Sequence, residues 1–374
     1  MKIALVHDYL TQLGGAEKVL QNLQEVFKDS PVFVLVNNKK ITSQIFDQTR
    51  IVSSWLQNFP LAISRYQWYL ALMPSAVESH RLNDFDVVIS SASSIAKAVK
   101  IRPDALHVCY CHTPTRYLWH DAEHYVEELK YNQLVKKIIS LFLKRLRHWD
   151  FLAARRVNYF IANSRLVQAR IKKYYGRESK IIYPPVDTQK FYIAQRLDNY
   201  YLSGGRLVAY KRYDLAIRAF NKLGIKLKIF GSGSDYPRLK KMACKNIEFL
   251  GNITDTAKAE LYAHTLAFIH PQVEDFGITA VESMAAGRPV IAYRAGGALE
   301  TVVPDVSGEF FDEQNWESLA NQIIHFKQEK FHPQLIKAHA ERFNSARFQQ
   351  EIKDYIGQLI NDYEINRVFK IKLL

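Results

Sequence analysis

Short apolar runs alternate with amphipathic stretches along most of the chain. In the first half, the apolar runs predict strands at residues 3–6, 32–36, 87–90, 106–109, 159–162 and 181–183. Between them, apolar positions recur at helical spacing, which predicts helices at 16–27, 64–81 and about 131–157. Strands that alternate with helices form parallel sheets covered on both faces, so the pattern predicts an α/β fold.

Two adjacent prolines interrupt this pattern at Tyr183-Pro-Pro-Val-Asp187. Because proline can neither continue a helix nor sit in a central strand, we expect a linker here. The alternation then resumes, with strands expected at 201–203, 226–230, 247–250, 267–270 and 290–293. We therefore expect two Rossmann-like, doubly wound domains, 1–185 and 186–350, with ligands in the cleft between them at the carboxyl ends of the strands. Residues 351–374 are expected to form a helix that crosses back to the first domain.

The composition excludes a disordered chain and a single small module. Of the 374 residues, 48% are hydrophobic and 24% charged, which allows a core in each domain. Three cysteines, Cys109, Cys111 and Cys244, are too few for a disulfide framework, and we expect them to be reduced residues in or near the core. The chain shows neither a signal-peptide pattern nor an apolar run of membrane-spanning length, which predicts a cytoplasmic protein.

Positive charge is concentrated in one segment. The formal net charge is +14, and residues 130–177 contain 13 Lys and Arg with a single acidic residue, Asp150. A local excess of this size predicts an anionic partner. On a helical wheel, a basic line runs opposite an apolar stripe. The line comprises Lys130, Lys137, Lys144, His148 and Arg155, and the stripe comprises Val135, Ile138, Ile139, Phe142, Leu146, Trp149 and Ala153.

Two interpretations of the basic segment stay open. A helix packed on its domain, with a solvated basic face, explains the pattern. However, Leu141 and Phe151 flank the basic line, and a mixture of cations and exposed apolar groups suits a surface rich in anionic lipid. The protein would then be peripheral on the inner face of the cell membrane. Because no motif of an RNA- or DNA-binding module is present, nucleic acid is not the expected partner.

Glycine-rich turns follow several predicted strands. In the first domain, Gly14-Gly15 precedes a helix whose first N–H groups can bind an anion or a hydroxyl, although a glycine pair is often merely a turn. In the second domain, Arg206 and Lys211 lie beyond a strand, five positions apart, and such cations suit a pyrophosphate. Gly231-Ser232 forms a further turn of this kind, suited to ribose or phosphate contacts.

The most specific pattern runs from Glu274 to Glu282. If a helix begins near Gly277, the two carboxylates lie about 12 Å apart along it, at roughly 1.5 Å per residue. The hexose and the ribose of a nucleoside diphosphate sugar are separated by about that distance. Glu274 is then placed for sugar hydroxyls and Glu282 for the ribose diol. The donor-binding set also includes Asp275, Phe276, Gly277 and Ile278, with the N–H groups of the last three placed for the phosphates. The alternative is a solvated acidic helix start with one exposed glutamate.

Together, these motifs resemble the retaining family 4 glycosyltransferases of GT-B fold. Glu274 to Glu282 is similar to their E-x7-E motif, and Arg206 and Lys211 are similar to their donor-phosphate pair. Further segments are similar to bacterial O-antigen and exopolysaccharide mannosyltransferases that use GDP-mannose. These segments are His7-Asp-Tyr-Leu10, Cys111-His-Thr-Pro-Thr-Arg-Tyr-Leu-Trp119, Tyr183-Pro-Pro-Val-Asp187 and Val208-Ala-Tyr-Lys-Arg-Tyr-Asp214. Ala209 departs from the proline of many relatives, which we expect to alter loop stiffness more than chemistry.

The resemblance implies a catalytic group of four residues. Arg206 and Lys211 would stabilise the charge on the departing nucleotide, which makes a metal ion dispensable. Glu274 would contact the transferred sugar, and His112 matches the family's cleft histidine near the reacting sugar. Gly14 and Gly15 would frame the donor and acceptor space, and Glu282 would hold the ribose. Asp84-Phe-Asp86 mimics a metal-binding pair but leads directly into a predicted strand, so no metal cofactor is expected.

The resulting hypothesis is a retaining glycosyltransferase that moves a hexose onto a lipid-linked oligosaccharide in cell-surface polysaccharide synthesis, and the favoured hexose is mannose from GDP-mannose. Retention of the anomeric configuration is implied by the resemblance. Two alternatives stay open: a UDP-sugar-dependent transferase of the same fold, and a sugar-nucleotide-binding protein without turnover. The presence of Glu274, Arg206 and Lys211 disfavours the second alternative.

Overall fold

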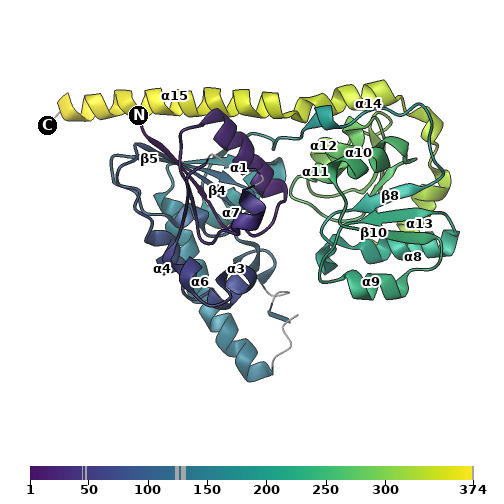
Figure 1. Cartoon of the computed structure of the whole chain (residues 1–374), viewed down its shortest axis with the longest axis horizontal. Helices are drawn as coiled ribbons and strands as arrows, with labels where there is room; N and C mark the ends of the chain where they lie inside the picture. Colours follow the sequence, from purple (N-terminus) through teal and green to yellow (C-terminus); the bar gives the residue numbers. More distant parts are fainter. Residues whose placement is uncertain (44, 47–48, 123–125, 128–131, 373–374) are drawn as a thin grey trace. The chain divides into compact units, whose positions relative to one another are not determined.

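The computed structural model describes residues 1–43, 45–46, 49–122, 126–127 and 132–372. The chain forms two compact units. The first comprises Met1–Tyr183 together with Phe348–Leu374, and the second comprises Pro184–Arg347. Each unit is an α/β structure with one sheet, as Figure 1 shows.

A seven-stranded sheet lies at the centre of the first unit. Its strands are all parallel and follow the order β3-β2-β1-β4-β5-β6-β7. Their bounds are β1 (Ile3–His7), β2 (Val32–Val34), β3 (Ile51–Ser53), β4 (Val87–Ala92), β5 (Leu106–Cys111), β6 (Tyr159–Ala162) and β7 (Ser179–Ile181). The predicted α/β class is confirmed, while β3 was missed and β7 begins earlier than expected.

Helices cover both faces of this sheet. They include α1 (Gly15–Val26), α2 (Lys39–Thr42), α3 (Ala62–Arg65), α4 (Met73–Glu78), α6 (Gln133–Arg156), α7 (Arg165–Tyr175) and α15 (Ser345–Lys372). The single helix expected at 64–81 is wrong, because α3, a 3-10 turn and α4 occupy this stretch. Pro74 lies in the first turn of α4, where its missing N–H costs no helical hydrogen bond, whereas in the interior of a longer helix it would remove one, so a helix starts here rather than continues. The start expected for α6 at residue 131 lies outside the described residues.

The second unit contains a six-stranded parallel sheet in the order β10-β9-β8-β11-β12-β13. Its strands are β8 (Tyr201–Gly204), β9 (Leu227–Phe230), β10 (Ile247–Gly251), β11 (Phe268–His270), β12 (Val290–Tyr293) and β13 (Gly308–Phe311). The helices are α8 (Tyr213–Leu223), α9 (Tyr236–Met242), α10 (Asp255–His264), α11 (Ile278–Ala285), α12 (Ala298–Thr301), α13 (Trp316–His325) and α14 (Pro333–Ala340). Only β13 among these strands was not anticipated, because Gly308 opens it and obscures its apolar run.

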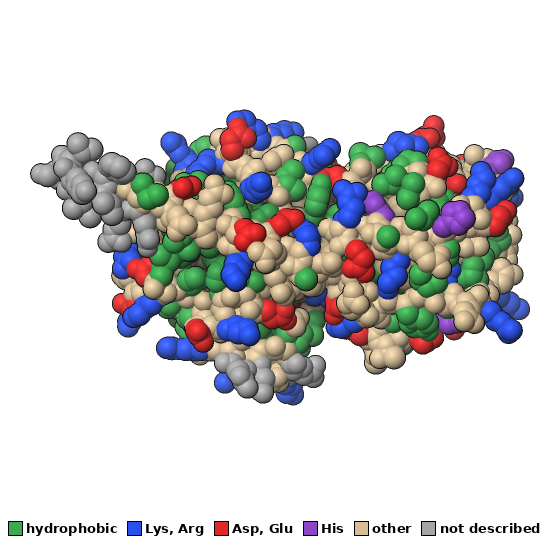
Figure 2. Space-filling view, turned by 90° about the horizontal axis from the view of Figure 1, so that it is seen from above, with side chains coloured by type: hydrophobic (Ala, Val, Ile, Leu, Met, Phe, Trp, Pro, Cys, Tyr) green, Lys and Arg blue, Asp and Glu red, His purple; other side chains and the backbone are tan. Residues whose placement is uncertain are grey.

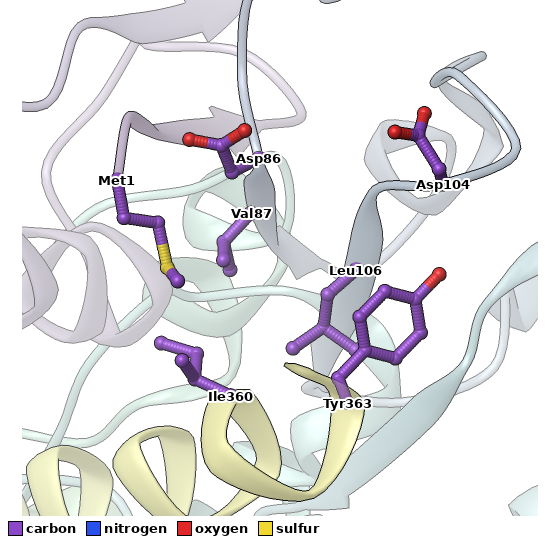
Figure 3. Close-up of a pocket in the computed structure, with 7 residues that line it drawn as sticks. All are labelled: Met1, Asp86, Val87, Asp104, Leu106, Ile360 and Tyr363. Carbon is purple, nitrogen blue, oxygen red and sulfur yellow. The ribbon is translucent and has the colours of Figure 1, made fainter. Parts of the chain in front are cut away.

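The last helix, α15, packs on the first unit, over the sheet formed by the start of the chain (Figure 1). Phe348, Ile352, Ile356 and Leu359 are buried in the same apolar cluster as residues of β1, β2 and β4. Near its end, α15 borders a hollow of about 240 Å³ at the amino ends of β4 and β5. Figure 3 shows apolar side chains turned toward one another there, with the carboxylates of Asp86 and Asp104 at its edge.

The cysteines only partly match their expected positions. Cys109 and Cys111 are buried in β5, and both are free thiols. Cys244 is exposed, so the expectation of a core or near-core position is wrong for this residue. It lies in the connection after α9, where it follows the helix rather than packing beneath it. Among the described residues, no helix combines the length and the apolarity needed to cross a bilayer.

Candidate active site

Most candidate residues lie where the strand order of each sheet reverses. In the first unit β1 neighbours β4, and in the second unit β8 neighbours β11. At such a pair, the two connections leave in opposite directions and open a crevice at the carboxyl ends of the strands, where parallel α/β sheets bind ligands. His7 ends β1, Gly204 ends β8 and His270 ends β11. Each unit therefore carries candidate residues at a crevice of this kind.

In the second unit, the connections after β8 and β11 bring Lys211 and Glu274 into contact. The Lys211 Nζ lies 2.8 Å from Oε1 of Glu274, and the two side chains are only 13% and 16% exposed. Burial alone would lower the pKa of Lys211, but the Glu274 carboxylate outweighs it and raises the pKa overall. A charged ammonium group is thus fixed beside a carboxylate, an arrangement that can bind a phosphate and a sugar hydroxyl together.

Two glycines allow the loops of this region to approach one another. Gly231 has a φ of +104°, and a Cβ atom there would lie 1.8 Å from the carbonyl oxygen of Gly205. Gly277, the N-cap residue of α11, has a φ of +91°. Other residues rarely adopt such angles, so both predicted donor-binding positions require glycine for backbone reasons as well.

Glu282 is buried inside α11, with 2% of its surface exposed. Its Oε1 accepts a hydrogen bond from Nζ of Lys258 at 2.9 Å, and its Oε2 accepts one from the Tyr262 hydroxyl at 3.5 Å. The alternative of an exposed, solvated glutamate is therefore wrong, while the ribose-binding role stays a prediction. Lys258 and Tyr262 were missed because they belong to α10, which no local motif links to α11.

The flanking cation Arg206 is exposed, and its Nη2 donates a hydrogen bond to the Tyr210 hydroxyl at 3.1 Å. Ser232 is also exposed, and its carbonyl oxygen accepts a hydrogen bond from the N–H of Leu207 at 2.8 Å. The turn after β9 is thereby tied to the turn after β8. Both turns can therefore contribute to one ligand, while their ligand-binding roles stay predictions.

The loop before α11 holds the remaining donor-binding candidates. Asp275 and Ile278 lie on either side of the Phe276-Gly277 pair. The ring of Phe276 is buried against Phe343, with ring centroids 5.4 Å apart. Its backbone, rather than its side chain, is therefore the part suited to ligand contact.

In the first unit, a chain of hydrogen bonds holds His112, which follows β5. Its Nε2 lies 2.8 Å from Oγ of Ser91, and the same Oγ lies 3.1 Å from Nδ1 of His7. A serine hydroxyl carries one hydrogen atom, so it can donate to one of these rings while it accepts from the other. Burial, with a smaller contribution from His7, lowers the pKa of His112 to about 4, which keeps its imidazole neutral at pH 7.

A further polar contact leads from His7 toward the glycine pair that precedes α1. Nε2 of His7 lies 3.9 Å from Oε1 of Glu17, and Oε2 of Glu17 accepts a hydrogen bond from the N–H of Gly14 at 2.8 Å. Gly15 is the first residue of α1. The structure therefore connects the predicted Gly14-Gly15 turn with His112 through three buried residues that were not predicted as site residues. A signal for one of them, Ser91, was the polar run at the end of a buried strand.

The Asp84-Phe-Asp86 sequence lies at the amino end of β4, the opposite edge of the sheet from His112. Asp86 accepts a hydrogen bond from the N–H of Lys2 at 2.8 Å and pairs with Arg102. Within the described ranges, no group of three or more His, Cys, Asp or Glu side chains is arranged to hold a metal ion. Asp86 thus anchors the entry into the strand.

The helix α6 presents a mixed basic and apolar face. Leu143, Leu146 and Asp150 are buried, whereas Leu141 is 71% exposed and Ile138 is 62% exposed. The assignment of Ile138 to the buried stripe is wrong, because the packed residues at this end of α6 begin with Ile139. The cations Lys137, Lys144 and Arg155 are exposed alongside these apolar residues.

Residues 59–72 lie beside α6, since Leu70 packs against the cluster that contains Leu143 and Leu146. This segment exposes Trp68 by 67% and Leu61 by 60%. The Arg65 guanidinium lies 5.5 Å from the centre of the Trp68 ring. We call the exposed face of α6 together with residues 59–72 the basic apolar surface.

Comparison with known proteins identifies the class to which this fold and these motifs belong. Residues 13–190 match the family model described as Glycosyltransferase Family 4, and residues 189–346 match the model described as Glycosyl transferases group 1. The solved structure of Anabaena HepE in complex with UDP and glucose has the same fold, with a TM-score of 0.69 at 20% identity over 96% of this chain and 99% of that one. The two units therefore form a GT-B fold.

Characterised relatives include enzymes that transfer mannose. The alpha-1,3/1,6-mannosyltransferase ALG2 of Saccharomyces cerevisiae is 26% identical over 82% of this chain and 72% of its own length. A GDP-mannose-dependent alpha-mannosyltransferase of Mycolicibacterium smegmatis is 34% identical over 34% of each chain. Other curated relatives are matched over only 25% to 37% of their own length. Together the two family models match residues 13–346, and the chain therefore belongs to the glycosyltransferases that these models describe.

Proposed function

We propose that the protein transfers mannose from GDP-mannose to a lipid-linked oligosaccharide used in cell-surface polysaccharide synthesis, with retention of the anomeric configuration. The observation that carries the proposal is the contact between Lys211 and Glu274 at the carboxyl ends of β8 and β11. The names of the yeast and mycobacterial relatives favour mannose, and the mycobacterial name favours GDP as the nucleotide.

The chemistry requires groups that stabilise charge on the departing diphosphate. The bond between the anomeric carbon of the sugar and the phosphate oxygen breaks, while the acceptor hydroxyl forms a new bond to that carbon and loses its proton to the leaving phosphate. Lys211 and Arg206 are placed to neutralise the phosphate charge, and the N–H groups at the start of α11 add to it. Glu274 is placed to orient a sugar hydroxyl, and neutral His112 can hydrogen-bond the reacting sugar.

A second donor class is supported by one of the structural relatives. Anabaena HepE was solved with UDP and glucose, and it shares the fold over nearly the whole chain. A UDP-sugar would use the same diphosphate contacts, because those contacts do not involve the base. The two candidates differ only in the nucleotide base and the sugar.

A panel of sugar nucleotides tests the donor. GDP-mannose, UDP-glucose, UDP-galactose and UDP-N-acetylglucosamine are each added to the protein, and the shift in Tm and the rate of hydrolysis are measured. We expect GDP-mannose to bind most tightly and therefore to give the largest shift in Tm. A ligand at about 100 times its Kd stabilises the folded state by about 2.7 kcal/mol. A preference for a UDP-sugar would replace the first proposal by the second, and binding without hydrolysis of any of these donors would favour a binding protein.

We also propose that the basic apolar surface attaches the protein to the anionic inner face of the cell membrane, where a lipid-linked acceptor would reside. It combines exposed cations with Trp68, Leu61, Leu141 and Ile138, and tryptophan is favoured at membrane interfaces. Within the first unit, α15 and α6 lie on opposite sides (Figure 1). The side that carries α15, which Figure 2 shows, has acidic and basic side chains interspersed rather than the mixture of cations and apolar groups found on α6.

Flotation with liposomes tests this attachment. We expect the protein to float with vesicles that contain phosphatidylglycerol and to remain in solution with neutral phosphatidylcholine, since each cation near an anionic surface contributes about 1 kcal/mol. The Trp68→Ser/Leu141→Ser variant should bind the anionic vesicles at least about tenfold more weakly. A matched control is Ile324→Ser, an apolar residue of α13 that is 63% exposed in the second unit. Equal flotation with both lipids would restore the interpretation of a merely solvated helix face.

A further inference from the structure

Two buried polar groups near Lys211 and Glu274 have no hydrogen-bond partner within the described part of the chain. They are the hydroxyl of Tyr213, the first residue of α8, and Nε2 of His270, the last residue of β11. Tyr213 is 1% exposed and His270 is fully buried. Folded proteins rarely leave such groups unpaired, because the group loses its bonds to water without replacement. The absence of partners for these two buried groups therefore needs a structural explanation.

Both groups face glycines at the candidate site. A Cβ atom on Gly205 would lie 3.1 Å from the Tyr213 hydroxyl and 3.6 Å from Nζ of Lys211. A Cβ atom on Gly277 would lie 3.2 Å from Nε2 of His270. Because glycine has no side chain, a ligand can approach the backbone at both positions. The two unpaired groups and the Lys211 ammonium thus border one region between the ends of β8 and β11.

Both groups are hydrogen-bond donors in the ligand-free protein. Burial raises the pKa of Tyr213, so its hydroxyl keeps its proton. Burial lowers the pKa of His270 to about 4, so its ring is neutral at pH 7. Nε2 of Gln272 lies 3.2 Å from Nδ1 of His270 and 3.5 Å from Oε1 of Glu274. An amide nitrogen can only donate, so Nδ1 of His270 accepts and its hydrogen atom is on Nε2.

We propose that the Tyr213 hydroxyl and Nε2 of His270 are further hydrogen-bond donors to the diphosphate of the bound nucleotide. Two fixed donors without acceptors, an ammonium group and the start of α11 together match an anion that carries several oxygen atoms. In the free protein, Glu274 accepts from Lys211 but leaves these two donors unpaired. The inference rests on the proposed function only in that the ligand is a nucleoside diphosphate, and it is independent of the base and the sugar.

The Tyr213→Phe variant distinguishes a role of the hydroxyl in nucleotide binding from a role in folding. Its Kd for GDP and for UDP is measured by calorimetry and compared with the wild type, with guanosine and uridine as probes that lack phosphate. We expect diphosphate binding to weaken by about tenfold or more, the value typical of one hydrogen bond to a charged group, and nucleoside binding to stay unchanged. The Tm without ligand should be equal to or above that of the wild type, since the substitution removes an unpaired buried hydroxyl.

Tyr200→Phe is the matched control, because the Tyr200 hydroxyl is buried in the same unit but donates to the carbonyl oxygen of Leu261 at 2.8 Å. We expect its Tm to fall and its Kd values to stay unchanged. For His270, the amide of His270→Gln should retain more diphosphate binding than His270→Phe. Wild-type affinity in Tyr213→Phe would overturn this inference alone. If the wild type binds neither GDP nor UDP, the proposed function fails and the inference fails with it.

Discussion

A Lys211→Met enzyme will turn over its sugar nucleotide at least about a hundredfold more slowly than the wild type, the loss typical of removing one group that stabilises transition-state charge. The ammonium group is held by Glu274 at 2.8 Å and keeps its proton, so it is fixed before any ligand arrives. Because the ammonium group need not move, it can stabilise the negative charge that develops on the leaving phosphate in the transition state without a cost of reorganisation. The measurement is kcat/KM for the donor identified by the panel, with Tm recorded for each variant.

The loss of Lys211 also leaves the Glu274 carboxylate without its ammonium partner, so stability must be separated from chemistry. A Lys211→Met/Glu274→Gln double variant removes both charges and should fold with a near-native Tm while turnover stays low. Arg238→Ala is the matched control: its partner Asp235 is in the same unit, and the arginine is about half exposed. It should keep normal activity. Turnover of Lys211→Met within about threefold of the wild type would exclude the phosphate-binding role.

An Asp150→Ala variant will lose about 3 to 5 kcal/mol of unfolding free energy, the usual cost of leaving one buried charge of an ion pair uncompensated. Oδ1 of Asp150 lies 2.5 Å from Nζ of Lys97, and both side chains are at most 2% exposed. The carboxylate also accepts hydrogen bonds from the Thr115 hydroxyl, the Trp119 indole and the Tyr175 hydroxyl. Urea denaturation measures the loss.

Two further variants identify the cause of that loss. Lys97→Met/Asp150→Ala removes the stranded cation and should recover part of the stability, since two charges are then absent rather than one. Glu178→Ala removes a carboxylate that is 81% exposed and pairs with Lys172, and it should change stability by less than about 1 kcal/mol. A loss below about 1 kcal/mol for Asp150→Ala would show that water reaches Lys97 and that the pair is not a buried one.

The fold was predictable because the strands of parallel sheets are buried on both faces. Such strands appear as continuous apolar runs, and β4 and β5 are buried along their whole length. The missed strand β3 has three residues of intermediate burial at the edge of the sheet, where the apolar signal is weakest. The incorrect helix at 64–81 has a different cause, since its apolar spacing is helical but Pro74 starts a new helix within it.

The candidate site was predictable only where its residues share a local motif. Lys211 and Glu274 were named from spacing and from resemblance, and the structure brings them together. Lys258 could not be found in this way, because it reaches Glu282 from another helix. Ser91 likewise reaches His112 across two neighbouring strands. Such contacts depend on which helices and strands pack side by side, which a single sequence does not specify.

The packing of α15 determines when the first unit can finish folding. Phe348, Ile352, Ile356 and Leu359 complete an apolar cluster whose other buried members lie between Leu5 and Ile182. During synthesis, residues 1–183 are made well before residue 348, so the nascent first unit must wait with the part of its core beneath α15 uncovered. We expect the first unit to become resistant to proteases only late in translation, once α15 covers this part of its core.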